Sequence, residues 1–429
     1  MLPEKVLIFP AGTEIAFEIL NALKYSKFVE VYGVNSTPSH AEFVFERYIH
    51  ADLPFVKSPG FIDAFNKILD EYEIDYVYPA HDDACMILAQ QSEKLHAKLV
   101  SSPLTTVDIC RSKNKTYSFF RNESFVPKTY MSADEVDDFP VFIKPAVGQG
   151  SAGAKKIGSR AELVRELSEG RELAVCEYLP GEEYTIDCFT DRHGSLRVCQ
   201  MRVRQRIKMG IAVRSSLIPS DEGVKKIAET INSKLEFNGA WFFQLKKNAA
   251  GEYRLLEISP RIPGTMGTSR MLGINYPLLT LYNMWGFDVS IINNELDITL
   301  DRAFINRYRT SLVYDRVYLD FDDTLYIGNK VNVNLIAFCY QCVNKNIPLF
   351  LLTKHADDIH ESLSRFKINH ELFDEIIGIH KNEDKADYIK GTRPIFIDDS
   401  FSERINVRQK LGICVFDLDM VDCLLDWRM

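Results

Sequence analysis

Two stretches of the sequence combine residue types that could bind and activate phosphate groups. The first is a short apolar segment that ends in Lys144 and is followed by a glycine-rich loop, residues 148–153. Glycine lets a run of backbone N–H groups approach phosphate oxygens, and lysine adds a point charge for the phosphates. The pattern indicates a phosphate-binding loop, although a glycine-rich segment taken alone is also typical of a plain flexible turn.

Polar residues further along the chain could complete a nucleotide site. The strand edge that begins at Glu177 could offer backbone groups to adenine, and a carboxylate in this segment could accept hydrogen bonds from ribose hydroxyls. Gln244 lies within a later predicted strand, and Glu257 lies near the end of the next one. Oxygen ligands on adjacent strands suit Mg²⁺, which takes few carboxylates together with phosphate oxygens and water.

Acidic residues dominate the second stretch. The apolar residues 317–319 are followed by Asp320 and Asp322, and a later apolar strand ends in Asp398 and Asp399. Carboxylates this close repel one another unless a cation joins them. The sequence lacks the twelve-residue loop of an EF-hand, with its glycine and final glutamate. The pattern therefore predicts a site for a divalent cation; the alternative is a charged loop after a buried strand.

The elements that must position these residues alternate between strands and helices in the N-terminal part of the chain. Strands are predicted at residues 6–9, 29–34 and 76–79, and helices at residues 15–23 and 61–72. This alternation predicts a parallel sheet, and ligands of such sheets bind at the loops that follow the carboxyl ends of the strands.

Two loops meet this criterion, residues 10–13 and residues 79–83. The second contains His81, Asp82 and Asp83, which could bind a substrate. We favour the alternative, in which they begin the next helix and match its dipole.

Three domains are expected from the length of 429 residues and from the change in pattern along the chain. Residues 1–108 form the first α/β domain, residues 109–310 a β-rich domain, and residues 311–429 a second α/β domain, so the fold class combines α/β and α+β. The strands predicted in the last two domains are residues 141–144, 174–178, 184–190, 196–204, 241–247, 253–258, 317–321, 349–353 and 395–397.

Taken in order, the motifs of roughly residues 1–290 resemble the ATP-grasp superfamily, in particular its carbamoyl-phosphate-synthase-like and amino-acid ligase members. The matching motifs are "NK" at Lys115, then "FIKP", "GQGSAG", "EYLPGEEYTID" and "LEISPRIPG". The resemblance implies a Rossmann-like pre-ATP-grasp domain followed by the ATP-grasp fold, with ATP and Mg²⁺ as cofactors. It implies nucleotide-binding roles for Lys115, Lys144, Gly150, Ser151, Glu177, Tyr178, Leu179 and Glu183, and metal-binding roles for Gln244, Glu257 and Ser259.

Within that set, the resemblance gives Lys115 and Lys144 to the phosphates, Gly150 and Ser151 to a phosphate lid, Glu177 and the next backbone groups to adenine, and Glu183 to ribose. It makes Arg261 the residue that stabilises the transferring phosphoryl group. Ser259 stands where the family usually has asparagine, which puts a second metal ion in doubt.

The mechanism that this resemblance implies begins with formation of an acyl phosphate. A substrate carboxylate attacks the γ-phosphate, and an amine or other nucleophile then displaces phosphate, while the protein supplies position and charge neutralisation. Arg204 and Arg214 could clamp the substrate carboxylate bidentately. A solvated strand face is an equal alternative for these two arginines. The alternating basic residues 202–208 share one strand face, for which the two alternatives are phosphate contact and solvated charge.

The acidic stretch resembles the haloacid dehalogenase (HAD) superfamily over roughly residues 313–429, with little room for a cap domain. The resemblance implies a Rossmann-like HAD domain that acts on a phosphorylated substrate. Asp320 would be the nucleophile and Asp322 the general acid and base, while Thr353 would bind phosphoryl oxygens. The neutralising lysine would be Lys385, with Lys381 as the alternative, and Mg²⁺ would be bound by Asp320, Asp322, Asp398 and Asp399.

The composition excludes several other classes of protein. The net charge of −9 and the lack of a basic stripe argue against nucleic-acid binding. No apolar run is long enough for a membrane span, no secretory signal is recognisable, and nine cysteines at irregular spacing indicate a reducing cytoplasm. Cys339 and Cys342 form a C-x-x-C in an apolar helix, where we favour core packing over metal or redox use.

The leading hypothesis is a bifunctional enzyme that joins a carboxylate to an amine with ATP and also removes a phosphate group. Its partners would be small-molecule carboxylate and amine substrates, and a homodimer is one assembly that we consider. The alternatives are an ATP-grasp kinase that phosphorylates a small metabolite, and a ligase whose HAD module is only regulatory. Processing of nucleic-acid ends is disfavoured by the acidic charge.

Overall fold

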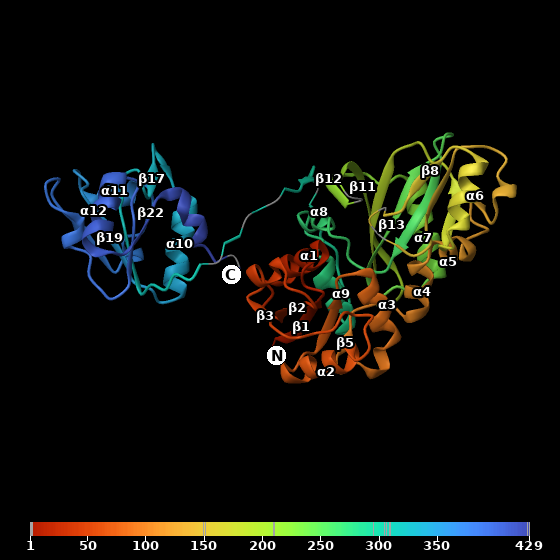
Figure 1. Cartoon of the computed structure of the whole chain (residues 1–429), viewed down its shortest axis with the longest axis horizontal. Helices are drawn as coiled ribbons and strands as arrows, with labels where there is room; N and C mark the ends of the chain where they lie inside the picture. The colour runs from red at the N-terminus through yellow and green to blue at the C-terminus, as the bar shows by residue number, and fades with distance from the viewer. Residues whose placement is uncertain are drawn as a thin grey trace. The chain divides into compact units, whose positions relative to one another are not determined.

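The computed structural model describes residues 3–148, 150, 152–208, 211–294, 296–303, 305, 307–308, 310–426 and 428. The chain divides into two compact units, Met1–Phe304 and Ile305–Met429, each with its own hydrophobic core (Figure 1). This division falls close to the predicted boundary after residue 310. The further division of the first unit near residue 108 stays a prediction.

The first unit opens with a five-stranded parallel sheet in the order β3-β2-β1-β4-β5, as the alternation of strands and helices predicted. Its strands are β1 (Glu4–Phe9), β2 (Val29–Val34), β3 (Arg47–Ile49), β4 (Tyr76–Pro79) and β5 (Lys98–Leu99). Its helices are α1 (Glu14–Leu23), α2 (Phe61–Glu71) and α3 (Asp82–Gln90). Helix α2 buries Phe61, Phe65, Ile68 and Leu69, which lie on one face at helical spacing.

Two antiparallel sheets follow in the first unit, linked to the parallel sheet by α4 (Leu104–Arg111) and α5 (Lys113–Phe119). The four-stranded sheet has the order β6-β9-β7-β8, made of Thr129–Tyr130, Leu173–Glu177, Val141–Pro145 and Lys155–Ile157. The six-stranded sheet has the order β14-β13-β10-β11-β12-β15, made of Tyr253–Ser259, Gly239–Lys247, Glu183–Thr190, Leu196–Lys208, Ile211–Ile218 and Thr299–Asp301. Their helices are α6 (Arg160–Ser168), α7 (Glu222–Lys234), α8 (Gly267–Arg270) and α9 (Tyr276–Met284).

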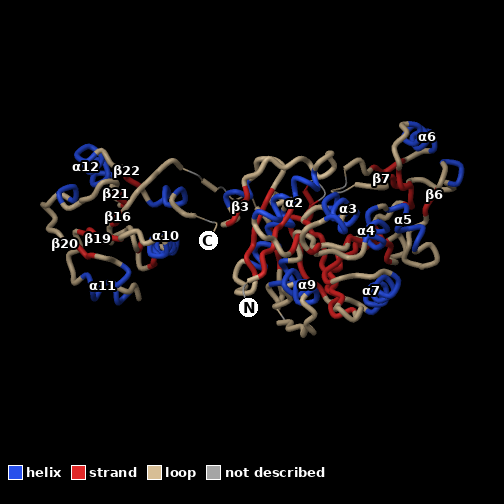
Figure 2. The backbone as a smooth tube through the Cα atoms, turned by 90° about the horizontal axis from the view of Figure 1, so that it is seen from below, coloured by secondary structure: helices blue, strands red, loops and turns tan. Residues whose placement is uncertain are grey.

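The second unit is built around a five-stranded parallel sheet in the order β20-β19-β16-β21-β22. Its strands are β16 (Arg316–Leu319), β19 (Leu349–Thr353), β20 (Glu375–Gly378), β21 (Pro394–Ile397) and β22 (Cys414–Phe416). Figure 2 shows α12 (Phe401–Leu411) on one face of this sheet and α10 (Val333–Asn344) and α11 (Ile359–Arg365) on the other. Between β16 and α10 lies only the small hairpin of β17 (Tyr326–Ile327) and β18 (Lys330–Val331), in agreement with the expected lack of a large cap.

Alternation along the strands explains the two cores of the second unit. Val317 and Leu319 pack with α10 and α11, whereas Tyr318 between them packs with α12. Cys339 and Cys342 are fully buried on α10 as free thiols, which confirms that this C-x-x-C serves packing.

Short 3₁₀ helices complete the described part of the chain: η1 (His40–Phe43), η2 (Ser92–Lys94), η3 (Ala133–Glu135), η4 (His370–Leu372), η5 (Lys385–Asp387) and η6 (Leu418–Cys423). The segment that begins at Lys385 is thus a single tight turn. Among the described residues, every helix is too short or too polar to cross a lipid bilayer.

Candidate functional site

A cavity in the first unit is lined by strands of both antiparallel sheets and by the glycine-rich loop. Its lining includes Lys113, Lys144, Gly148, Gly150, Glu177, Tyr178, Leu179, Glu183, Arg204, Gln244 and Glu257. The structure therefore brings together most of the residues to which the sequence assigned nucleotide binding. Ser151 lies outside the described residues.

Lys144 is the most buried cation of this cavity. It lies on β7, which ends beside the glycine-rich loop, and its Nζ donates to the backbone carbonyl of Leu256 at 3.0 Å. Its ammonium group also lies 5.3 Å from the ring centroid of Tyr117. Burial lowers the pKa of Lys144 from its ordinary value, and the charge on Lys113 acts in the same direction. An anion such as a phosphate group would compensate this lost solvation.

The second lysine of the cavity is Lys113, not Lys115. Lys113 is the first residue of α5, and its Nζ lies 3.4 Å from the carbonyl oxygen of Gly148. Two residues further on, the helix has turned by about 200°, so that Lys115 faces away. Lys115 forms an exposed ion pair with Asp108 at 2.7 Å. The sequence analysis named only Lys115, and the rotation of the helix puts Lys113 in the cavity in its place.

The adenine and ribose candidates already have protein partners. The Glu177 carboxylate accepts from the backbone N–H of Lys128 at 2.9 Å and from Nε of Arg254 at 3.2 Å, so the backbone after Glu177 is left for a base. The side chain of Glu183 forms an ion pair with Arg204. Glu183 thus fixes Arg204 in the cavity, in addition to any contact with a sugar hydroxyl.

The proposed metal ligands face one another across two strands. Gln244 on β13 is paired in register with Glu257 on β14. The Gln244 side-chain oxygen accepts from Arg204 at 3.2 Å, whereas the Glu257 carboxylate makes no hydrogen bond or ion pair within the described part of the chain. Glu257 can therefore serve as a ligand of Mg²⁺. Because Glu257 is the single free carboxylate at this position, Glu257 and Gln244 fit a metal ion that nucleotide phosphates help to hold.

Arg261 and Ser259 both contact Asp82, the first residue of α3. Arg261 donates through Nε at 2.6 Å and through Nη2 at 2.9 Å to the two carboxylate oxygens, and the Ser259 hydroxyl lies 3.5 Å from one of them. Burial acts to raise the pKa of Asp82, but the charge and hydrogen bonds of Arg261 outweigh it and lower the pKa to about 2. This pair was not expected from sequence, because it joins residues far apart in the chain.

The helix-capping interpretation of residues 79–83 is confirmed in part. His81 is the N-cap of α3, and its Nδ1 accepts from the backbone N–H of Asp83 at 3.1 Å. Asp83 is paired with Arg111 and Lys57, both at 2.7 Å. The acidic residues thus also anchor basic side chains around the cavities.

A second, larger cavity of about 730 Å³ shares Lys113, Arg204, Gln244 and Glu257 with the first. It continues to α1 and to the residues after Arg261. The basic residues of β11 do not form one solvated face, because register shifts lie on both sides of Arg206. Arg202 is buried against Asp187, and Arg204 lines both cavities.

Beyond these, Arg206 and Arg214 are exposed residues next to Asp301 and line neither cavity. Of the two arginines considered as a carboxylate clamp, only Arg204 therefore lines the cavities.

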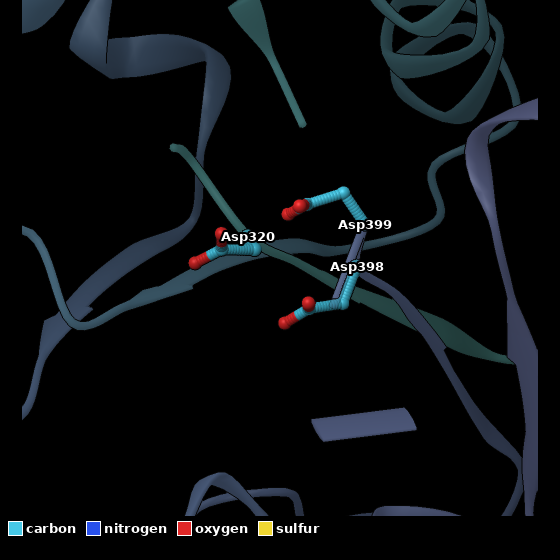
Figure 3. Close-up of side chains that lie close together, drawn as sticks. All are labelled: Asp320, Asp398 and Asp399. Atoms are coloured by element: carbon cyan, nitrogen blue, oxygen red, sulfur yellow. The ribbon is translucent and has the colours of Figure 1, made fainter. Parts of the chain in front are cut away.

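The second unit gathers carboxylates at the carboxyl edge of its sheet. Ligand atoms of Asp320, Asp398 and Asp399 lie within 4.8 Å of one another (Figure 3). Lys385 Nζ lies 2.7 Å from Asp320 and 2.6 Å from Asp398. Burial raises the pKa of Asp320 to about 6, with a further contribution from Asp398, while Lys385 opposes the shift. Of the two candidate lysines, the structure thus places Lys385 in the site, whereas Lys381 is exposed.

Asp322 lies outside this carboxylate group. Its carboxylate accepts from the Tyr326 hydroxyl at 2.8 Å and lies 2.8 Å from Nδ1 of His355. This position fits an acid–base group better than a metal ligand. Sequence reasoning missed His355, although its place two residues after Thr353 was a usable signal.

Thr353 and Thr324 complete the site. Thr353 ends β19 and is buried, and its hydroxyl oxygen accepts from the backbone N–H of His355 at 3.2 Å. The Thr324 hydroxyl donates to Asp399 at 3.1 Å. Thr353 thus holds the backbone at His355 in place, and Thr324 holds the carboxylate of Asp399.

Comparison with known proteins places the first unit in a fold class: the chain has the ATP-grasp fold. The biotin carboxylase domain of 2-oxoglutarate carboxylase from Hydrogenobacter thermophilus, solved with MgADP, ADP and bicarbonate, superposes with a TM-score of 0.58 at 15% identity over 70% of this chain and 74% of that one. Biotin carboxylase from Campylobacter jejuni gives a TM-score of 0.55 at 15% identity, covering 69% and 74%. N5-carboxyaminoimidazole synthetase from Staphylococcus aureus, complexed with ADP, gives 0.54 at 12% identity, covering 67% and 78%.

A family profile described as "ATP-grasp in the biosynthetic pathway with Ter operon" matches residues 169–300. This segment includes Glu177, Glu183, Gln244 and Glu257. No curated protein matches the sequence significantly.

Proposed function

We propose that the first unit is a Mg-ATP-dependent carboxylate–amine ligase that forms an acyl phosphate. The observation that carries this proposal is the joint placement of buried Lys144, Lys113 and the unpaired Glu257 carboxylate around one cavity. The fold and the ADP complexes of similar structures support ATP and Mg²⁺ as the nucleotide and metal.

In this proposal a substrate carboxylate oxygen bonds to the γ-phosphorus and the bond to the bridging oxygen of ADP breaks. The nitrogen of an amine then bonds to the acyl carbon, and phosphate leaves. Lys144 and Lys113 neutralise phosphate charge, Glu257 and Gln244 would hold the metal, and Arg204 orients the carboxylate. When bound, Mg²⁺ would neutralise phosphate oxygens.

Identification of the nucleotide product tests the reaction class. Turnover of ATP with pooled small metabolites should release ADP and phosphate, read by nucleotide chromatography. AMP with pyrophosphate as the main product would contradict the acyl-phosphate route. ADP release with a phosphorylated metabolite and no amide would instead identify a kinase.

We also propose that the second unit is a Mg²⁺-dependent phosphatase of the HAD type. Its support is the contact of Lys385 with two of three clustered carboxylates, of which Asp320 would attack phosphorus and Asp322 would protonate the leaving oxygen. Water activated by Asp322 would then release phosphate from Asp320. Hydrolysis of an aryl phosphate by the full chain tests this; a folded chain with intact ADP release but no hydrolysis would favour a regulatory module.

A further inference from the structure

Two side chains of the second unit hold the carboxylate of Asp322. The Tyr326 hydroxyl donates to Oδ1 at 2.8 Å, and Nδ1 of His355 lies 2.8 Å from Oδ1 and 3.0 Å from Oδ2. The side chain of Asp322 is 40% exposed, whereas that of His355 is 8% exposed. Within the described part of the chain, Oδ1 thus has two of these contacts and Oδ2 has one, which leaves Oδ2 the freer oxygen for proton exchange with a substrate.

The imidazole ring of His355 is itself fixed at both of its nitrogens. Its Nε2 lies 2.8 Å from the hydroxyl oxygen of Ser362 on α11. A neutral imidazole has one N–H and one acceptor nitrogen, so a hydroxyl that donates to Nε2 leaves the hydrogen on Nδ1, next to Asp322. The order Asp–His–Ser is that of a serine hydrolase triad, but the burial of Ser362 makes it an anchor for the ring instead of a nucleophile.

Buried aromatic rings support both groups that contact Asp322. The Phe321 ring is fully buried, and its centroid lies 5.0 Å from the ring of His355, edge to face, and 5.0 Å from the ring of Tyr326. Phe366 stacks on Tyr326 with a centroid distance of 4.4 Å. Such aromatic pairs are favourable and restrict ring orientation, so the two polar groups stay directed at Asp322.

The reaction proposed for the second unit needs a proton at the leaving oxygen. An oxygen of Asp320 bonds to phosphorus while the bond from phosphorus to the leaving oxygen breaks, and that oxygen takes the proton of the Asp322 carboxyl group. Asp322 is left as a carboxylate, whose charge the N–H of His355 and the O–H of Tyr326 stabilise. A general acid must lie within hydrogen-bond reach of the oxygen that it protonates, so a group that fixes its carboxyl contributes to the rate.

We propose that His355 is a positioning residue: anchored by Ser362, it holds Asp322 so that Oδ2 delivers the proton to the leaving oxygen. The inference rests on the proposed phosphatase function of the second unit. It gives a role to a residue that the sequence motifs left without one.

The test compares two substrates that differ in their need for a proton, using the full-length protein with Mg²⁺. 2,4-Dinitrophenyl phosphate releases a stable phenolate, whereas phenyl phosphate releases a basic phenolate that a general acid must protonate. The quantity measured is kcat/KM, because it reports only the steps up to departure of the leaving group. General acid catalysis contributes about 10²–10⁴, so His355→Leu should lower kcat/KM for phenyl phosphate by about tenfold or more. The value for 2,4-dinitrophenyl phosphate should change by at most a few-fold.

Three further variants separate positioning from general damage to the site. His355→Asn should retain most of the activity toward phenyl phosphate, because a side-chain amide can place an N–H where Nδ1 of histidine lies. Ser362→Ala should give a smaller loss than His355→Leu, again confined to phenyl phosphate. His370→Leu, which alters an exposed histidine of η4, should change neither substrate. Retained activity toward 2,4-dinitrophenyl phosphate shows that Asp320 and the fold around it are intact.

Two results would overturn the inference while the phosphatase proposal stands. One is an equal effect on the two substrates, or no effect on either, in both His355→Leu and Ser362→Ala. The other is an equal loss for phenyl phosphate in His355→Leu and His355→Asn. Failure of the wild-type protein to hydrolyse either substrate would instead overturn the phosphatase proposal, and the inference with it.

Discussion

The two candidate sites differ in how they balance charge. In the first unit Glu177, Glu183 and Asp82 each have an arginine partner from a neighbouring element, and the position proposed for the metal has the single free carboxylate of Glu257. In the second unit three carboxylates cluster around one lysine, Lys385, which contacts two of them. Net negative charge at a protein site is stabilised by a bound cation.

This difference in net charge indicates which of the two sites should bind a metal ion in the absence of substrate. The carboxylate cluster of the second unit should bind a divalent cation by itself. The cavity of the first unit carries Lys144 and Lys113 beside Glu257, so it should bind a metal ion only together with nucleotide phosphates.

The largest expected effect is that of Asp320→Asn. The change keeps the side-chain volume but removes the nucleophilic charge, so hydrolysis of an aryl phosphate should fall by about 10⁴ or more. ADP release by the first unit should stay within a few-fold of wild type, since Asp320 belongs to the other unit. Retained hydrolysis would show that the site is misassigned, and loss of both activities in a folded protein would show that the two units are coupled.

Removal of a phosphate-binding lysine should have the next largest effect. Lys144→Ala and Lys113→Ala should each slow ATP turnover by roughly 10²–10³, the range for loss of one preorganised charge contact in a phosphoryl-transfer site. Lys115→Ala is the matched control, because Lys115 is exposed and lines neither cavity. Equal losses in Lys113→Ala and Lys115→Ala would contradict the assignment.

The Asp82–Arg261 pair should contribute to stability more than to the charge of the site. Asp82→Asn leaves the Arg261 guanidinium without its partner and should lower the free energy of unfolding of the first unit by about 3 kcal/mol, read by urea denaturation. Asp108→Asn, which removes an exposed pair, should change it by less than about 1 kcal/mol. Similar values for the two variants would refute a special role for the pair.

The pH dependence follows from the same residue. The pKa of Asp82 is lowered from 3.8 to about 2 in the folded protein. Its contribution to the free energy of unfolding is therefore present above pH 4 and is lost as the pH falls toward 2. Asp82→Asn should therefore flatten the stability profile in this acidic window, and an unchanged profile would be inconsistent with the pairing.

Sequence patterns were sufficient where local periodicity decides structure. Strands β2, β4 and β19 have the predicted bounds, because apolar runs between turn residues specify them. Strands β12 and β15 were not predicted: β12 carries Arg214, Ser215 and Ser216 in place of an apolar run, and β15 is very short.

Site residues were predictable as far as they follow a strand end directly. Asp320 does so, and Lys144 is the last residue but one of its strand. The choice of Lys113 over Lys115 depends on helix rotation, and the contact of His355 with Asp322 depends on the adjacency of β16 and β19. Neither the choice of Lys113 nor the contact of His355 with Asp322 can be predicted from the spacing of residues in the sequence alone.

The most direct test of the account counts divalent cations bound to the full-length protein by electron paramagnetic resonance with Mn²⁺ in place of Mg²⁺. Without nucleotide, wild-type protein should bind one equivalent, and Asp399→Asn should weaken it. Addition of ADP should create a further binding site that Asp399→Asn leaves intact and Glu257→Gln removes. Two nucleotide-independent equivalents, or none, would contradict the contrast between the two sites.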